Sequence, residues 1–283
     1  MCNAASKLII AAALAAAATA CTSEKERRAA AAEQLRVQAE TLVASGQSEQ
    51  ALALLDSIDS AYGEQTAVRR TALATRAAAI EAATMQRIGP AQEALVRAQL
   101  TADSLQALFV HVDGPRGLEG HRVARELAKN DVTASTGIEP RIDGDGYLSI
   151  AAVVKGKRIG LNSLSVTTAA GTVQTPPVGE GRSIASEGSE LTSLRQEEVA
   201  EAMEAIAAAG DGPVKVHLDG SRGSVEVKIT PAMRAALVRS WQYAQALQRL
   251  RSASIERERL ERTLQTARDH RANAPLPSPS AGE

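Results

Sequence analysis

The stretch VKVHLDGSRGSVEVKITPAMRAAL, residues 214–237, carries two different hydrophobic patterns on either side of a proline. Apolar and polar residues alternate in VKVHLD, and the alternation returns in SVEVKI after the turn segment GSRGS. Alternation with a period of two predicts a β-hairpin with one buried face. After Pro231 the chain has no Gly or Pro until about Ala272, which predicts one long helix. Strands followed by a long helix indicate an α+β fold.

More short β patterns precede this hairpin. The runs GIEPRI, YLSIAAVV and RIGLNSLSV lie in a region rich in Gly, Pro and Thr, and they predict further strands. Between them and the hairpin, LRQEEVAEAMEAIAAAG is typical of a helix, and a brief helix is expected over residues 122–129. We therefore predict a small mixed α+β head over residues 111–230.

A helix is expected on each side of this head. A Gly-Pro pair predicts a break, with Pro90 opening a helix over residues 89–110. Apolar residues recur every three or four positions up to Phe109, so this helix has one apolar stripe that needs a partner. The helix over residues 231–272 has a seam that includes Trp241. We expect the two helices to form an antiparallel stalk, with the head inserted between them.

An N-terminal helical hairpin is expected within residues 21–88. EKERRAAAAEQLRVQAETLVAS predicts a helix that closes at Gly46, and SEQALALLDSID predicts a second helix with Ser48 as its N-cap. The junction resembles the elbow of a tetratricopeptide hairpin, but only one such unit is visible and a binding solenoid needs about three. A repeat array is therefore the weaker alternative. The proline-rich residues 273–283 are expected to be a disordered tail.

Composition limits the kinds of site the chain can form. Hydrophobic residues make up 44% of the 283 residues but aromatic residues only 2%, with one Trp and one Phe. Much of the chain should therefore be thin, closely packed helix, and large aromatic-walled pockets are not expected. Thirty-two basic and thirty-three acidic residues give a formal net charge of −1, which provides no global attraction for a polyanion. We expect no nucleic-acid partner.

Residues 1–20 have the features of a signal peptide. Lys7 precedes about eleven uncharged residues, LIIAAALAAAA, a run too short to span a bilayer. The small residues ATA then precede Cys21, which resembles the lipobox of bacterial lipoproteins, whose cysteine is acylated and becomes the first residue of the mature chain. Ala18 stands where lipoboxes most often carry Leu, and ordinary signal peptidase would cut the same bond. We expect lipidation of Cys21; ordinary secretion and an uncleaved helix are the alternatives.

Lipidation at Cys21 would anchor the chain to a membrane, because two or three acyl chains bind stably where one does not. Cys2 would leave with the signal peptide, so the mature chain would have no disulfide, thiolate metal site or cysteine nucleophile. Thr22 follows the cysteine where an Asp would retain a lipoprotein in the inner membrane. This favours the outer membrane, whereas the choice between its periplasmic and surface faces stays open.

One segment has residues typical of metal or acid–base chemistry. FVHVDGPRGLEGHRVAR places His111, Asp113, Glu119 and His121 within eleven residues. Their spacing matches no compact zinc motif, so we assign no catalytic or metal-binding residue and expect no cofactor. A metal- or acid–base-dependent envelope hydrolase that uses these four residues is the alternative function.

A second acidic segment has an incomplete calcium-loop pattern. In RIDGDGYLSI, Asp143 and Asp145 are spaced like the first two ligands of a calcium loop. Tyr147 occupies the third ligand position and Val154 the twelfth, where a Glu is needed. The sequence therefore favours a hairpin turn over a calcium site.

The segment VQTPPVGEGRSIASEGSE, residues 173–190, is the best candidate for a binding loop. It is expected to interrupt the strands of the head as a long loop, and long loops are either functional or merely mobile. Its charged residues are the candidate binding residues: Glu180, Arg182, Glu187 and Glu190.

Several motifs together resemble a known group. The lipobox, ALALLDSI, FVHVDGPRGLEG, GIEPRIDGDGYLSI, the TPPV loop and the long terminal helix resemble uncharacterised cell-envelope lipoproteins of the Bacteroidetes type. The resemblance covers most of the mature chain and implies an envelope lipoprotein with no catalytic residues. We expect a membrane-anchored structural or interaction module, with an envelope protein or glycan as a possible partner. An efflux adaptor is a further alternative, but adaptors insert their helical hairpin within β structure, the reverse of the order here.

Overall fold

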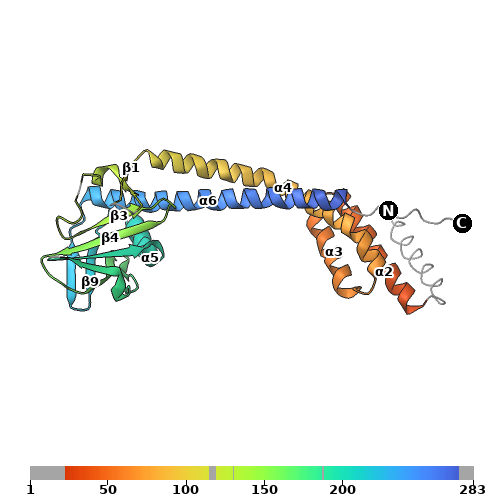
Figure 1. Ribbon diagram of the computed structural model, residues 1–283, viewed down its shortest axis with the longest axis horizontal. Coiled ribbons are helices and arrows are strands. Elements are labelled where there is room, and N and C mark those ends of the chain that lie inside the picture. The colour runs from red at the N-terminus through yellow and green to blue at the C-terminus, as the bar shows by residue number, and fades with distance from the viewer. Residues whose placement is uncertain (1–22, 115–118, 130, 187, 274–283) are drawn as a thin grey trace, which may run out of the picture. The chain divides into compact units, whose positions relative to one another are not determined.

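The computed structural model describes residues 23–114, 119–129, 131–186 and 188–273. These ranges form a mixed α+β fold with five α-helices and two antiparallel sheets (Figure 1). The helices are α2 (Glu24–Ala44), α3 (Ser48–Ala61), α4 (Thr66–Gln106), α5 (Gln196–Ala208) and α6 (Pro231–Ala272). The helix predicted after Pro231 is confirmed, with both of its ends.

The chain divides into two compact units. The helical unit consists of Met1–Glu93 and Ile255–Glu283, and the sheet unit consists of Ala94–Ser254. The sequence predicts boundaries at residues 88, 110 and 230, whereas the two units divide inside α4 and inside α6.

In the helical unit, local hydrogen bonds fix the ends of α2. Ser23 and Glu26 form a capping box, in which each side chain accepts the other residue's backbone N–H. At the other end Gly46 has φ 79°, and the N–H of Gln47 donates to the carbonyl of Leu42 at 2.8 Å. The predicted closure at Gly46 is confirmed. The prediction for Ser48 is wrong: Gln47 is the N-cap and Ser48 is the first helical residue, because this turn ends at Gln47.

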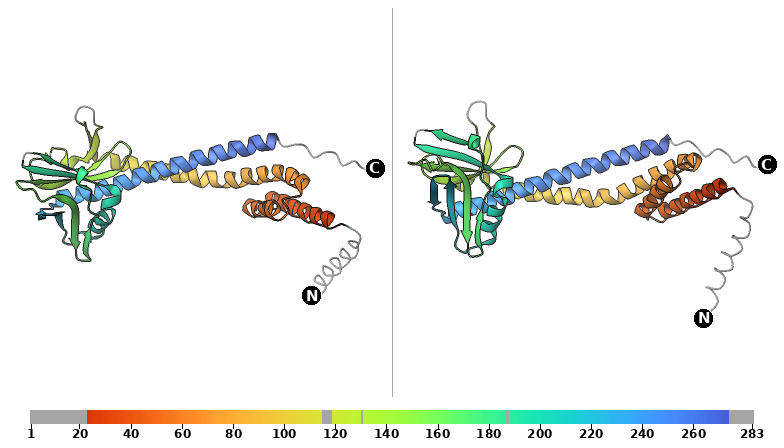
Figure 2. Two further views of the ribbon diagram at one scale, coloured as in Figure 1. Left: turned by 60° about the horizontal axis from the view of Figure 1, so that its bottom comes forward. Right: turned by 90° about the horizontal axis from the view of Figure 1, so that it is seen from below.

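The core of the helical unit is made largely of alanine. Helices α2 and α3 pack against each other, as both views in Figure 2 show. Alanine side chains allow two helix backbones to approach closely but bury little apolar area. The buried cluster consists of Ala32, Ala39, Ala51, Leu55, Ile58, Ala72 and Ala79.

Helix α4 does not break where the sequence predicts. It continues through Pro90 for 41 residues, so the predicted separate helix over residues 89–110 is wrong. Gly89 and Pro90 are exposed, so water can reach the carbonyl that the missing proline N–H leaves unpaired. Contacts to α6 hold the segment on both sides: Arg87 donates to Glu256 at 2.7 Å, and Gln92 accepts from Arg257 at 3.1 Å.

The sheet unit contains both sheets. The six-stranded sheet has the order β1 (Phe109–Val112), β2 (His121–Ala124), β3 (Gly137–Ile142), β4 (Leu148–Lys155), β8 (Ser189–Arg195) and β7 (Ser183–Ser186). The four-stranded sheet has the order β10 (Gly223–Val227), β9 (Lys215–Gly220), β5 (Leu161–Thr168) and β6 (Gly171–Gln174). The β9–β10 pair is the predicted hairpin, and α5 follows β8 as predicted.

Three predicted elements of this unit are corrected. Helix α4 ends at Gln106, and Phe109 begins strand β1 because FVHV pairs with the strand that follows it. The helix expected over residues 122–129 is instead β2 and a short 3-10 turn, because β2 is hydrogen-bonded between β1 and β3. The segment 173–190 is not one long loop: it contains β7 and the start of β8, which pair around Gly188 at φ 70°.

One large core unites the two sheets, α5 and the first part of α6. Strand β4 is buried on both faces between its neighbours. Leu237 and Trp241 of α6 belong to this core, and the ring of Tyr243 lies 4.6 Å from the ring of Phe109, centroid to centroid. Large aliphatic and aromatic side chains therefore stabilise the sheet unit.

Candidate functional site

The predicted lipidation site cannot be located in this fold. Cys21 and the predicted signal peptide 1–20 lie outside the described residues, as does Glu187. Among the helices of the described ranges, none is both long and apolar enough to cross a membrane. The lipidation of Cys21 stays a prediction.

Two of the candidate metal ligands lie on neighbouring strands. His111 on β1 is paired with Arg122, and His121 on β2 is paired with Val112, so the histidines are diagonal neighbours. Burial lowers the pKa of His121, and the positive charge of Arg141 and the nearby His111 lower it further. His121 is therefore held in its uncharged form at neutral pH.

The other two members of that segment do not complete a ligand set. The carboxylate of Asp113 lies 3.4 Å from Nε2 of His111, and both side chains are exposed. Within the residues that the structure describes, no three His, Cys, Asp or Glu side chains, Glu119 included, are placed to hold a metal ion. The hydrolase alternative stays a hypothesis.

The acidic turn between β3 and β4 is built by hydrogen bonds. A carboxylate oxygen of Asp143 accepts the N–H of Tyr147 at 2.8 Å, and Asp145 lies 3.6 Å from Arg251 of α6. Gly146 has φ 86°, and a Cβ there would lie 2.8 Å from Cβ of Leu247. The predicted hairpin turn is confirmed, and its close contact with α6 explains the glycine.

Two of the candidate binding residues of segment 173–190, Arg182 and Glu190, make contacts within the sheet unit. Arg182 pairs with Glu198 of α5 and donates to the carbonyl of Ser193 at 2.6 Å. Glu180 lies in the short 3-10 helix before β7. Arg182 therefore ties this segment to α5 and β8, and its role in binding stays a prediction.

Glu190 is a buried carboxylate that fixes the start of β5. Its oxygens accept the backbone N–H groups of Ile159, Gly160 and Leu161 at 2.9, 3.1 and 3.1 Å. Arg222 donates to it at 3.3 Å. Burial raises the pKa of Glu190, but the three N–H donors and Arg222 outweigh burial and hold the pKa below its ordinary value. Glu190 thus stays ionised and joins β8 to the other sheet.

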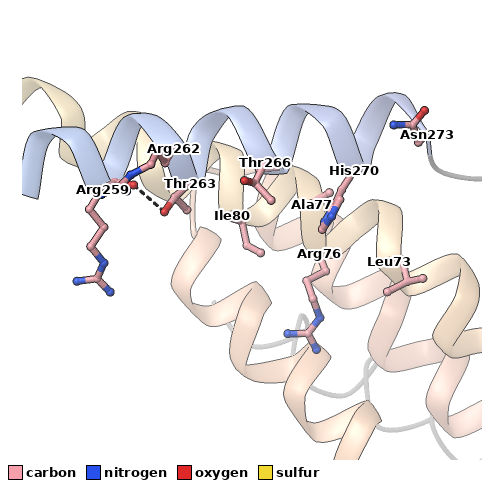
Figure 3. Close-up of a pocket in the computed structure, with 11 residues that line it drawn as sticks. Leu73, Arg76, Ala77, Ile80, Arg259, Arg262, Thr263, Thr266, His270 and Asn273 are labelled. Atoms are coloured by element: carbon pink, nitrogen blue, oxygen red, sulfur yellow. Dashed lines mark hydrogen bonds between the residues drawn. The ribbon is translucent and has the colours of Figure 1, made fainter.

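A pocket in the helical unit is a candidate ligand site (Figure 3). We name it the α4–α6 pocket; its volume is about 600 Å³, within the range of ligand-binding pockets. Helix α4 contributes Leu73, Arg76, Ala77 and Ile80. Helix α6 and the residue after it contribute Arg259, Arg262, Thr263, Thr266, Ala267, His270 and Asn273.

The α4–α6 pocket combines an aliphatic floor with a basic rim. Ala77 and Ala267 are buried at its base, whereas Leu73 is 58% exposed. Among the described residues that line it, none is acidic. The hydroxyl of Thr263 donates to the carbonyl of Arg259 at 2.9 Å, the dashed contact in Figure 3. The pocket can therefore accept an apolar group beside an anionic one.

The sequence does not predict this pocket. Its α4 residues recur every three or four positions, but such spacing predicts only a shared helix face and not what covers it. The partner face on α6 is nearly 190 residues away, and arginines beside alanines are typical of a solvated helix.

Comparisons of the chain with protein families, with curated proteins and with solved structures find no match.

Proposed function

We propose that this chain is a lipid-anchored bacterial envelope protein that acts as a structural or interaction module and not as an enzyme. The observation that carries the proposal is Cys21, placed directly after small residues that end an uncharged run of about eleven residues. The outer membrane is the proposed location, because Thr22 and not Asp follows the cysteine. Shortly after the cysteine, the three charged residues of SEKE form the first turn of α2.

The proposed architecture has an N-terminal helical hairpin, an antiparallel stalk and a head inserted between the stalk helices. Ion pairs within the helical unit support opposite directions for α4 and α6. Glu81 of α4 contacts Arg268 and Arg271, whereas Arg87, further along α4, contacts Glu256, earlier on α6. Such a module displays a compact sheet unit from a membrane anchor without needing a catalytic site.

The anchor is tested by the substitution Cys21→Ser in the bacterial host. The wild type should take up labelled palmitate and sediment with membranes, because acyl chains would be its anchor. Cys21→Ser should take up no label and be released. Cys2→Ser is the matched control and should behave as the wild type, because Cys2 would leave with the signal peptide.

The outcomes separate the alternatives. A wild type that is cleaved but unlabelled would indicate ordinary secretion. A Cys21→Ser protein that stays in the membrane at its full length would indicate an uncleaved helix. Either result contradicts the proposed lipid anchor.

Crosslinking tests the stalk. In a Cys21→Ser, Cys2→Ser background, cysteines at Glu81 and Arg271 should be joined within one molecule by a short bis-maleimide crosslinker, because the tips of the two wild-type side chains meet at 3.0 Å. The shorter cysteine side chains would be too far apart for a direct disulfide. Cysteines at Glu81 and Arg249 are the control, and should not be joined. Crosslinks formed only between molecules would contradict the intramolecular stalk and indicate an oligomeric coiled coil.

A further inference from the structure

The charges on the rim of the α4–α6 pocket are unequally neutralised. Arg76 donates to Asp56 at 2.6 Å and to Asp59 at 2.7 Å, so its charge is already paired with α3. Arg259 only approaches Glu256, at 3.7 Å. Arg262 makes no ion pair or hydrogen bond through its side chain with any residue in the described ranges. One end of the pocket, near Arg259 and Arg262, thus has an uncompensated positive charge.

The floor of the same pocket is suited to a hydrocarbon chain. Leu73, Ala77 and Ile80 follow one face of α4 and meet Ala267 of α6, as the labelled side chains in Figure 3 show for α4. These side chains are all aliphatic, and Leu73 leaves more than half of its surface in water. Covering this surface with an apolar group would be favourable at about 25 cal/mol per Å².

The pocket walls offer little to a peptide. Both walls are helices, and away from the C-terminal turn of α6 their backbone N–H and C=O groups are already paired with each other. The hydroxyl of Thr263 is also in use, on the carbonyl of Arg259. A peptide would bring amide groups that find few partners here, and leaving such groups unpaired is costly. A chain without amides avoids this cost.

We propose that the α4–α6 pocket binds one anionic phospholipid, with an acyl chain on the Leu73–Ile80 floor and the phosphate on Arg262 and Arg259. Arginine guanidinium groups hold phosphate oxygens through charge-assisted hydrogen bonds. The lipid comes from the membrane that holds the anchor, because the pocket lies in the same compact unit as the residues that follow Cys21. Only this choice of source rests on the proposed function.

Binding is measured by isothermal titration of the full chain carrying Cys21→Ser, which keeps every described residue. The probe is dodecyl phosphate below its micelle concentration, which combines one alkyl chain with one phosphate. It should bind at one site per chain. Dodecyl maltoside and inorganic phosphate should each bind at least tenfold more weakly, because each supplies only half of the required chemistry.

Two substitutions locate the site. Arg262→Glu should weaken dodecyl phosphate binding at least tenfold, because it replaces attraction by repulsion. Thr266→Trp, at an exposed position on the pocket wall, should block the floor and abolish binding. Arg249→Glu is the matched control on the exposed surface of α6 outside the pocket, and should leave binding unchanged. Equal melting temperatures of all three proteins and the wild type would show that they are folded.

Several outcomes would overturn the proposal. Equal binding of dodecyl maltoside would show that the charge plays no part, and equal binding of inorganic phosphate would show that the floor plays none. If Arg262→Glu and Arg249→Glu weakened binding equally, dodecyl phosphate would bind outside the α4–α6 pocket. If an acidic amphipathic peptide bound and dodecyl phosphate did not, the pocket would be assigned to a protein partner. Palmitate labelling of Cys21 is independent of all these results, so the proposal of a lipid anchor and the proposal of a lipid-binding pocket can be contradicted separately.

Discussion

The two compact units are stabilised by different kinds of side chain. The sheet unit has a core of Leu, Ile and Val with Phe109, Trp241 and Tyr243. The helical unit has a small core dominated by alanine, with Leu55 and Ile58 as its largest fully buried side chains. Around that core lie ion pairs between helices, such as those of Arg76 and Glu81.

This difference has a physical consequence for each unit. Burial of large side chains contributes about 1.5–3 kcal/mol each, whereas exposed ion pairs contribute about 0–1 kcal/mol. The sheet unit should therefore resist unfolding strongly, and removing one large buried side chain should greatly lower its free energy of unfolding. The helical unit should be sensitive to the size of its alanines and only weakly sensitive to its charges. Such a unit can leave a pocket between its helices, because it has few large side chains to fill the space.

The largest effect is expected for Trp241→Ala in the sheet unit. Trp241 is 6% exposed, so its removal should leave a cavity and lower the free energy of unfolding by about 3–5 kcal/mol. Urea unfolding followed by hydrogen exchange of the sheet unit would measure this. Tyr147→Ala is the control: because Tyr147 is 47% exposed, its removal should lower the free energy of unfolding much less. Similar costs for the two would show that Trp241 is not a core residue.

The next effect is expected for Glu190→Ala. It leaves three backbone N–H groups unpaired in a buried site, at a cost of about 3 kcal/mol. Because the folded-state pKa of Glu190 is lowered, its contribution is complete above the ordinary Glu pKa of about 4.3 and is lost as the pH falls through the folded pKa. The acid limb of the stability profile should therefore become shallower in Glu190→Ala. Glu226→Ala, at an exposed position of β10, should leave it unchanged.

A smaller effect is expected for Ala39→Leu in the helical unit. Ala39 has no exposed surface, so a larger side chain would force α2 away from its neighbours and lower stability by about 1–3 kcal/mol. Thermal unfolding with hydrogen exchange of residues 24–61 would detect it. Gln38→Leu, at an exposed position of the same helix, is the control. If Ala39→Leu raised the melting temperature, the helices would have room to spare and the contrast between the units would be weaker.

Local patterns in the sequence predict the parts of the fold that depend on near neighbours. The β9–β10 hairpin, α5 and both ends of α6 follow from alternation, helical spacing and Pro231. The continuity of α4 through Pro90 does not, because it depends on contacts with α6 about 165 residues away. The sequence also does not predict strands β7 and β8, because the short run before Gly188 becomes a strand only by pairing with β8 and, through it, with β4.

The same limit applies to the candidate sites. Glu190 was predicted from its place in a charged segment, yet its buried contacts come from the turn before β5, some thirty residues earlier. The α4–α6 pocket depends on two helix faces that the sequence separates by most of the chain. Cys21 is the opposite case, since a processing signal is read as a linear motif and needs no fold.

The smallest effect is expected for Glu81→Gln, which tests whether charges matter in the helical unit. The Glu81 side chain is 15% exposed and accepts from Arg271 at 3.0 Å and from Arg268 at 3.2 Å. These hydrogen bonds lower its pKa, so the contribution of Glu81 is present above the ordinary Glu pKa and is lost as the pH falls through the folded value. Both arginines are at least half exposed, so water and salt screen the pair and Glu81→Gln should cost about 0.5 kcal/mol. Thermal unfolding in 0.02 and 1 M salt, at about pH 7, is the measurement, and the difference in stability between the wild type and Glu81→Gln should shrink at high salt.

A cost above about 2 kcal/mol that salt does not change would mean that Glu81 is a buried support of the helical unit. The ion pairs, and not the alanine core, would then be the main stabilising contacts of that unit.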